Sequence, residues 1–337
     1  MVKSETVALD ERLARALLAS AGLPGDEITA QLVRTLGAVE TVKAALSDPP
    51  VLADMGVGRQ ELEHWYQRVS ESLDPDRLGS ILVETEATGA QLLIPGDPGW
   101  PHGMEMLGDH GPLALWVRGD VGALSDPAIG VIGTRAATGY GAHMAAELAD
   151  GAASQGFTVV GTGAHGVAAA AHRATLLAGG RTIAVLPSGV DRLYPAGQTD
   201  LLEQIAQTGA LVSELAPGAA PTRWTLMQRG RVITGLSSAV VVVEAGARSG
   251  ALVHAAQSAE FGRPVGAIPG PVTSAVSVGS NRLLRDEIAS LVTNIDDVTS
   301  LIRRAGGNLP RTLTAGSADH AHVASTSAPM REQDRGL

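Results

Sequence analysis

The chain has 337 residues, of which 45% are hydrophobic and 18% are charged, and its formal net charge is −10 at pH 7. This composition predicts a globular protein with a large core and roughly two domains. The acidic balance excludes a protein that coats nucleic acid with its whole surface, but it leaves room for a local basic groove. The sequence has no cysteine, no leader-like start and no long apolar run. We therefore expect a cytoplasmic protein without disulfides or a membrane span.

The first 75 residues show the periodicity of short helices. Apolar residues recur at three- and four-residue spacings between Asp10 and Leu73, as they do on one face of an α-helix. Turn-forming residues interrupt this pattern at 22–25, at Gly37 and at 48–50, which divides it into four predicted helices. We predict a small helical domain over residues 1–75, of the size of a sterile-alpha-motif or helix-hairpin-helix module. Such a module contacts protein or DNA, and a helical cap on the main domain is an equal alternative.

Residues 76–298 alternate between apolar strands and helical stretches. Segments that are apolar throughout are typical of a parallel sheet covered on both faces. The predicted strands are 128–132, 158–160, 182–186, 211–212, 239–243 and 264–267, and residues 75–120 are expected to add one or two more. The predicted helices are 143–154, 167–178, 199–208 and 251–262. This alternation predicts a doubly wound α/β domain.

The C-terminal segment, residues 299–337, is rich in Gly, Ser, Thr, Ala and charged residues. It shows no apolar periodicity. We expect it to be a disordered tail, because such a composition cannot bury enough apolar surface to fold.

Five or six predicted strand ends carry Gly together with Thr, Ser or Arg. The first reads Gly133-Thr134-Arg135, the second is the loop 161–166, and a later one runs from Glu244 to Gly250. In an open parallel sheet, ligands bind beyond the carboxyl ends of the strands, where backbone N–H groups attract anions. One pyrophosphate needs fewer such loops than this. The pattern favours an extended anionic ligand.

The loop 161–166 matches G-x-G-x-x-G, so a dinucleotide site must be weighed. The match follows the second strand of the domain, and the strand 182–186 does not end in the acid that such a site requires. A glycine triplet alone is a weak signal, and we predict no cofactor. Nor do we predict a metal site, because no His and carboxylate cluster occurs at ligand spacing.

Residues 223–231, RWTLMQRGR, place three arginines and one tryptophan within nine positions. A charged run is usually a solvated surface, but arginine interleaved with tryptophan also suits a single nucleic-acid strand. Glu214 and Glu244 end two predicted strands. They are candidates for a catalytic carboxylate pair, although hydrogen bonding to loop amides is the more ordinary role of such residues.

Six ordered segments between about 92 and 296 resemble the DprA/Smf family of bacterial DNA-processing proteins. They are VIGTRAATGYG, GTGAHGVAAAAHRATL, TIAVLPSGVDRLYPAG, GALVSELAPG, QRGRVITGLSSAVVVVEAGARSGALVHAA and GRPVGAIPGPVTS. The resemblance implies an extended Rossmann-like fold over residues 76–298, with a sterile-alpha-motif-like domain before it. It also implies a homodimeric, non-enzymatic mediator that binds single-stranded DNA, protects it and loads the RecA recombinase.

The resemblance also implies where the DNA phosphates bind, and His165 joins the set because it lies in a glycine loop. The candidate residues are Gly133, Thr134, Arg135, Gly163, His165, Gly166, Arg229, Arg231, Ser249 and Gly250. Four positions depart from the family pattern. Ala168 replaces an acid, Leu226 an aromatic residue and Gly230 an asparagine, while Ala196 stands where many members have a cation. We expect these departures to alter DNA binding, as in a diverged member.

A second hypothesis is an enzyme related to the nucleoside-monophosphate phosphoribohydrolases, which use a similar sheet. Their hallmark is Pro-Gly-Gly-x-Gly-Thr-x-x-Glu at a strand end. The corresponding residues here are 244–252, EAGARSGAL, which lack both the glycine pair and the downstream acid. A nucleotide-binding module is a third and less specific possibility.

Overall fold

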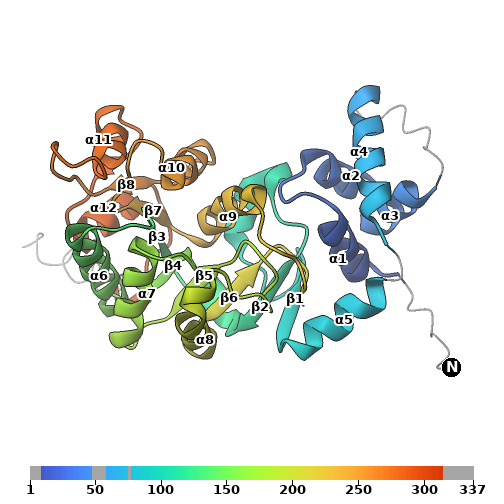
Figure 1. Cartoon of the computed structure of the whole chain (residues 1–337), viewed down its shortest axis with the longest axis horizontal. Coiled ribbons are helices and arrows are strands. Elements are labelled where there is room, and N and C mark those ends of the chain that lie inside the picture. The colour runs from blue at the N-terminus through green and yellow to red at the C-terminus, as the bar shows by residue number, and fades with distance from the viewer. Residues whose placement is uncertain (1–8, 48–57, 75–76, 314–337) are drawn as a thin grey trace, which may run out of the picture.

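A nine-stranded sheet forms the centre of the molecule in the computed structural model, which describes residues 9–47, 58–74 and 77–313 (Figure 1). The strands are β1 (Ala90–Leu93), β2 (Leu115–Gly119), β3 (Ala128–Ile132), β4 (Thr158–Thr162), β5 (Thr182–Val185), β6 (Ala210–Ser213), β7 (Ala239–Val242), β8 (Val265–Ala267) and β9 (Ser290–Leu291). Their order across the sheet is β1-β2-β6-β5-β4-β3-β7-β8-β9. β2 pairs antiparallel with both β1 and β6, and all pairs from β6 through β5, β4, β3, β7 and β8 to β9 are parallel. The predicted fold class is confirmed.

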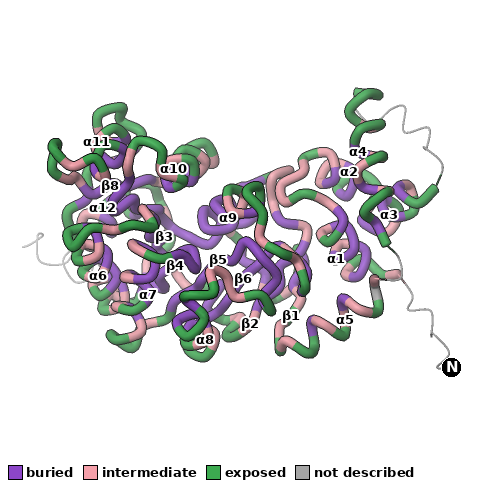
Figure 2. The backbone as a smooth tube through the Cα atoms, in the orientation of Figure 1, coloured by how far each residue is buried: buried purple, intermediate pink, exposed green. Residues whose placement is uncertain are grey.

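All six strands predicted between 128 and 267 are present, with ends that differ from the prediction by at most two residues. β3 and β4 are buried at every position, as expected for central strands covered on both faces. Figure 2 shows this buried backbone running through the middle of the molecule. β9 was not predicted, because two residues carry no readable pattern.

Helices cover both faces of the sheet. α6 (Gly139–Ser154), α7 (Val167–Leu177), α8 (Thr199–Thr208) and α12 (Ile295–Arg304) pack on one face. α9 (Arg223–Leu236), α10 (Gly250–Glu260), α11 (Val278–Arg285) and the 3-10 helix η1 (His102–His110) pack on the other. Successive strand residues supply the two cores: Ile129 and Val131 face α6, while Ala128 and Ile132 face α9. Such alternation follows from the pleat of a strand.

The helix α9 was missed by the sequence analysis. Its periodicity is hidden because polar residues occupy buried positions, among them Arg229 and Arg231. The helix begins with a capping interaction in which the Thr222 side chain accepts a hydrogen bond from the Thr225 amide. This N-cap is the sequence signal that marks its start.

The four predicted N-terminal helices are present as α1 (Glu11–Ala21), α2 (Glu27–Leu36), α3 (Ala38–Leu46) and α4 (Arg59–Ser72), and α5 (Arg77–Ala87) follows them. Their core is continuous with the antiparallel end of the sheet. Leu17, Leu32 and Trp65 belong to the same buried cluster as Ile94 and Trp116. The helical stretch therefore extends past residue 75 to Ala87 and packs directly on the sheet.

The segment after residue 298 differs from its prediction. α12 runs from Ile295 to Arg304 and buries Val298, Leu301 and Ile302 against the sheet, so the tail expected from 299 onward is structured at least to 313. The helix was overlooked although its four apolar residues, Ile295, Val298, Leu301 and Ile302, follow helical spacing, because the predicted boundary at 298 divides this pattern. Residues 314–337 lie outside the described part. Within the described ranges no helix is long and apolar enough to cross a membrane.

Candidate functional site

A cleft of about 750 Å³ opens at the carboxyl ends of the central strands. It lies where β3 has β4 as its neighbour on one side and β7 on the other. The chain passes from β3 through α6 to β4, whereas β7 follows α9, so the direction of winding reverses here. Doubly wound sheets bind their ligands at this switch point.

The cleft is lined by cationic side chains and by no acidic ones. Arg135 follows β3, Arg248 follows β7, and Arg223 and Arg229 come from α9. None of the four pairs with a carboxylate in the part of the chain that the structure describes. In a chain of net charge −10, this is a local site of positive potential that attracts anions.

Arg229 is the least satisfied of the four arginines. Its side chain is buried, with 5% of the residue exposed, and its Nε and Nη1 atoms have no hydrogen-bond partner among the described residues. Burial lowers the pKa of Arg229 to about 9, and the nearby charge of Arg135 adds to this effect. The group still carries its charge at neutral pH. A buried cation without a partner costs several kcal/mol, a cost that an anion in the cleft would offset.

The loop after β3 is held in place by close backbone contacts. The Thr134 amide donates to the Glu244 carbonyl at 2.7 Å, and the Thr134 carbonyl accepts from the Val167 amide at 3.1 Å. Gly166 has φ +74°, and a Cβ there would overlap the backbone of Thr134 and Arg135. Only glycine allows this approach. The loop that carries Arg135 is therefore fixed before any ligand arrives.

The first turn of α10 also opens onto the cleft. Ser249 caps this helix, its Oγ accepting from the Ala251 amide at 3.3 Å, and both Ser249 and Gly250 line the cleft. The free N–H groups at a helix start favour a negative charge. This helix end adds to the attraction of the arginines.

Comparison with known proteins identifies the family. Residues 91–303 match the family of DNA recombination-mediator protein A. A putative DNA processing protein DprA from Mycobacterium tuberculosis is 40% identical over 297 residues, which cover 84% of this chain and 73% of the relative. The chain belongs to the DNA recombination-mediator protein A family.

Two solved structures of the family are similar to this one. DprA from Streptococcus pneumoniae is 28% identical, with a TM-score of 0.68 over 87% of this chain and 98% of that one. DNA processing protein A from Helicobacter pylori, described with a single-stranded DNA binding mode, is 27% identical, with a TM-score of 0.57 over 64% of this chain and 98% of that one. The recognition made from sequence motifs is confirmed.

The structure brings together six of the ten candidate residues, and four lie elsewhere. The six that line the cleft are Gly133, Thr134, Arg135, Arg229, Ser249 and Gly250. Gly166 lies beneath the Arg135 loop, and Gly163 packs near Leu202. His165 is exposed, and its Nδ1 lies 2.9 Å from Nε2 of Gln198. These three residues support or flank the cleft.

Arg231, the fourth, is directed away from the cleft. It is 2% exposed, and its Nη2 donates to both carboxylate oxygens of Glu214 at 2.9 and 2.7 Å. Its Nη1 donates to the His110 carbonyl and its Nε to Gln228 at 2.8 Å. Residues two apart on a helix point in roughly opposite directions, which separates Arg231 from Arg229.

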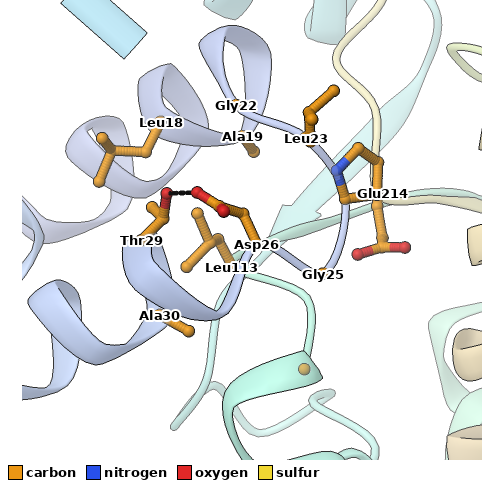
Figure 3. A pocket seen from close by; sticks show the side chains of 12 residues that line it. Leu18, Ala19, Gly22, Leu23, Gly25, Asp26, Thr29, Ala30, Leu113 and Glu214 are labelled. Atoms are coloured by element: carbon orange, nitrogen blue, oxygen red, sulfur yellow. Dashed lines mark hydrogen bonds between the residues drawn. The ribbon is translucent and has the colours of Figure 1, made fainter. Parts of the chain in front are cut away.

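Arg231 joins the helical region to the sheet. A Cβ on Gly25, which lies between α1 and α2 and has φ +74°, would meet the Arg231 guanidinium at 2.7 Å. Figure 3 shows the small cavity at this junction, which is lined by Gly25 from the helical region and by Glu214 from the end of β6. The family resemblance implied a phosphate contact for Arg231, because a residue's place in a motif does not reveal the direction of its side chain.

The two candidate carboxylates bond to other residues of the fold and do not face the cleft. Glu244 is buried and accepts from the Thr138 amide at 2.9 Å and the Thr138 hydroxyl at 2.7 Å. Glu214 is buried against Arg231, and burial raises its pKa while the guanidinium opposes that rise. Neither residue lines the cleft. Across the described residues, no group of three His or acidic side chains could hold a metal ion.

Two of the four departures from the family pattern have a visible setting. Leu226 lines the cleft, so the aromatic residue it replaces would face the ligand. At Gly230 a Cβ would lie 2.6 Å from Cδ2 of His254, so the buried His254 ring occupies the space of a larger side chain. Arg223 and Arg248 also line the cleft but were not among the ten candidate residues. Their sequence signals were the arginine-rich stretch 223–231 and the glycine-containing strand end 244–250.

Proposed function

We propose that this chain is a recombination mediator that binds single-stranded DNA in the arginine cleft and acts by binding rather than by catalysis. The observation that carries the proposal is the buried, unpaired guanidinium of Arg229 beside Arg135 in a cleft without acidic side chains. A phosphate accepts two hydrogen bonds from one guanidinium in a fork-like contact. Arg229 lines the cleft, so a phosphate bound there can pair with its guanidinium charge.

A polymer suits the cleft better than a single phosphate does. The four arginines come from three separate elements, namely the loop after β3, the loop after β7 and the helix α9. A flexible strand can place successive phosphates on cations arranged in this way. Contacts to the sugar-phosphate chain carry no sequence information, so we expect little sequence preference. The described Helicobacter pylori relative supports the choice of a single strand.

Two finer parts of the proposal rest on the family resemblance. We infer that the chain acts as a homodimer and that it hands the bound strand to the RecA recombinase. Both fit a mediator that holds DNA without modifying it. Co-sedimentation of the chain with RecA in the presence of an oligonucleotide tests the second part, and the first is tested by the mass of the protein in solution.

The proposed binding is tested by a salt titration with the variant Arg135→Ala. We expect the native chain to bind an oligo-dT single strand more tightly than a duplex of the same length. Loss of one phosphate contact should weaken binding about tenfold and flatten the salt slope by about 0.7. The matched control is Arg304→Ala, because Arg304 is exposed at the end of α12 and does not line the cleft. A slope that Arg135→Ala leaves unchanged would remove Arg135 from the site.

The enzyme hypothesis is tested in the same preparation. Release of free base from nucleoside monophosphates by the native chain would favour the phosphoribohydrolase reading. No acidic side chain lines the cleft, so we expect no release of free base.

A further inference from the structure

Trp224 is the exposed tryptophan of this protein. The chain has four tryptophans, and all lie in described segments. Trp65 and Trp116 are 0% exposed and Trp100 is 8% exposed, whereas Trp224 is 44% exposed. An indole buries a large apolar area when it is covered, so one left in water is a candidate for contact with a ligand.

Trp224 does not itself line the cleft, but its neighbours on α9 do. It is the second residue of α9, between Arg223, which lines the cleft, and Thr225. Met227 lies three residues further on and also lines the cleft, with 37% exposed. Residues three apart are neighbours on a helix surface. Val253 of α10 lines the cleft with the same exposure, so an apolar rim lies beside the arginines.

The first turn of α9 is fixed to the rest of the domain. The Thr225 hydroxyl donates to the Pro187 carbonyl at 2.7 Å in the loop after β5, and it accepts from the Thr222 amide at 2.9 Å. The Thr225 amide in turn donates to the Thr222 hydroxyl at 3.1 Å. Trp224 is therefore held by a rigid backbone. A pre-positioned aromatic ring loses little conformational freedom when it binds.

We propose that Trp224 stacks on a nucleobase of the strand whose phosphates bind the neighbouring arginines. The proposal rests on the proposed function and names a contact that the phosphate site does not supply. Every base has an aromatic face, so stacking on an indole tolerates any sequence. The flanking Arg223 is free of any acidic partner in the described structure and would hold the phosphate beside that base.

A protein partner is the competing occupant of this rim. Four unpaired arginines line the adjoining cleft, which favours a polyanion over a neutral protein surface. A base of the strand in the cleft can reach Trp224 without any second molecule.

The experiment compares two probes of equal length, oligo-dT and an abasic oligonucleotide that carries the same phosphates without bases. Because the other three tryptophans are buried, a change in tryptophan emission on binding reports mainly on Trp224. We expect oligo-dT to quench the emission of the native chain and the abasic probe to bind without quenching it. Trp224→Ala should weaken oligo-dT binding about tenfold and leave abasic binding unchanged, whereas Trp224→Phe should retain most of the oligo-dT affinity.

Leu177→Ala provides the matched control, because Leu177 is a 90% exposed apolar residue on α7 that does not line the cleft. If Trp224→Ala lost affinity equally for oligo-dT and for the abasic probe, the substitution would have a general effect on the cleft, and the stacking role would be overturned. The stacking role would also be overturned if Trp224→Ala bound oligo-dT as tightly as the native chain and oligo-dT did not quench the native emission. In that case a protein partner would be the better candidate for contact with Trp224. Failure of the native chain to bind either probe would instead overturn the proposed function.

Discussion

The cleft and the junction between the helical region and the sheet each receive one buried arginine from the same helix. At the junction, every donor-bearing part of the Arg231 guanidinium has a protein partner: Glu214, Gln228 or the His110 carbonyl. In the cleft, Arg229 has none for its Nε and Nη1 within the described residues. Both residues are buried, with 5% of Arg229 and 2% of Arg231 exposed, so the main difference between them lies in their partners.

This difference separates a structural cation from a ligand-binding one. A satisfied guanidinium stabilises the fold, because removal of either member of the pair leaves a buried charge alone. A buried guanidinium without partners lowers the stability of the fold, and it is expected where a ligand supplies the missing hydrogen bonds and charge. The partners of an arginine, rather than its presence in a motif, therefore indicate what it does in this protein.

The largest effect is expected at the junction. Arg231→Met should lower the free energy of unfolding by about 3–5 kcal/mol, because Glu214 is left buried without its partner. Urea denaturation followed by circular dichroism measures this change. The double variant Arg231→Met/Glu214→Leu should recover most of the loss. If the single variant were as stable as the native chain, the ion pair would not be what joins the two regions.

The next effect concerns His254, whose ring lies beside Arg229. Burial lowers the pKa of His254 to about 4, and the Arg229 charge adds to this shift. The unfolded chain, with a pKa near 6.5, binds more protons between these values, so stability falls as the pH drops from 6.5 towards 4. At pH 5 the loss should be about 2 kcal/mol for this group.

A second histidine supplies an internal comparison for that measurement. His172 lies on the buried face of α7, with its Nδ1 2.6 Å from the Thr182 hydroxyl, and its pKa is also lowered to about 4, mainly by burial. Urea denaturation at pH 7 and pH 5 should show a smaller loss in His254→Gln than in the native chain. If both proteins lost the same free energy of unfolding between pH 7 and pH 5, the pKa of His254 would not differ between the folded and unfolded chains.

The smallest effect on stability is expected at Arg229. Arg229→Met removes an unpaired buried charge and replaces it with an apolar side chain, so the free energy of unfolding should not decrease. Binding of oligo-dT should nevertheless fall about tenfold, because a charge-assisted contact to phosphate is lost. Parallel denaturation and binding measurements check both parts. A destabilisation as large as that of Arg231→Met would erase the distinction between the two regions.

The strands of the parallel sheet were predictable because each is a short apolar run whose neighbours are turns and amphipathic helices. The positions of Gly133, Thr134 and Ser249 in the cleft were predictable for a related reason. Carboxyl ends of parallel strands lie on one edge of a sheet, so residues after β3 and β7 must meet there. Helix α9 was missed because its buried face carries arginines where apolar residues are expected.

The sequence by itself determined the fold class, the strand positions and the loops that meet at the edge of the sheet, since all of these follow from local apolar patterns and turn chemistry. The tertiary structure decided that Arg229 enters the cleft while Arg231 enters the junction, and that Gly166 supports the Arg135 loop from below. Two residues apart on a helix, side chains point to opposite sides. Which side holds a ligand and which holds a carboxylate depends on elements distant in the chain, so no local pattern could reveal it.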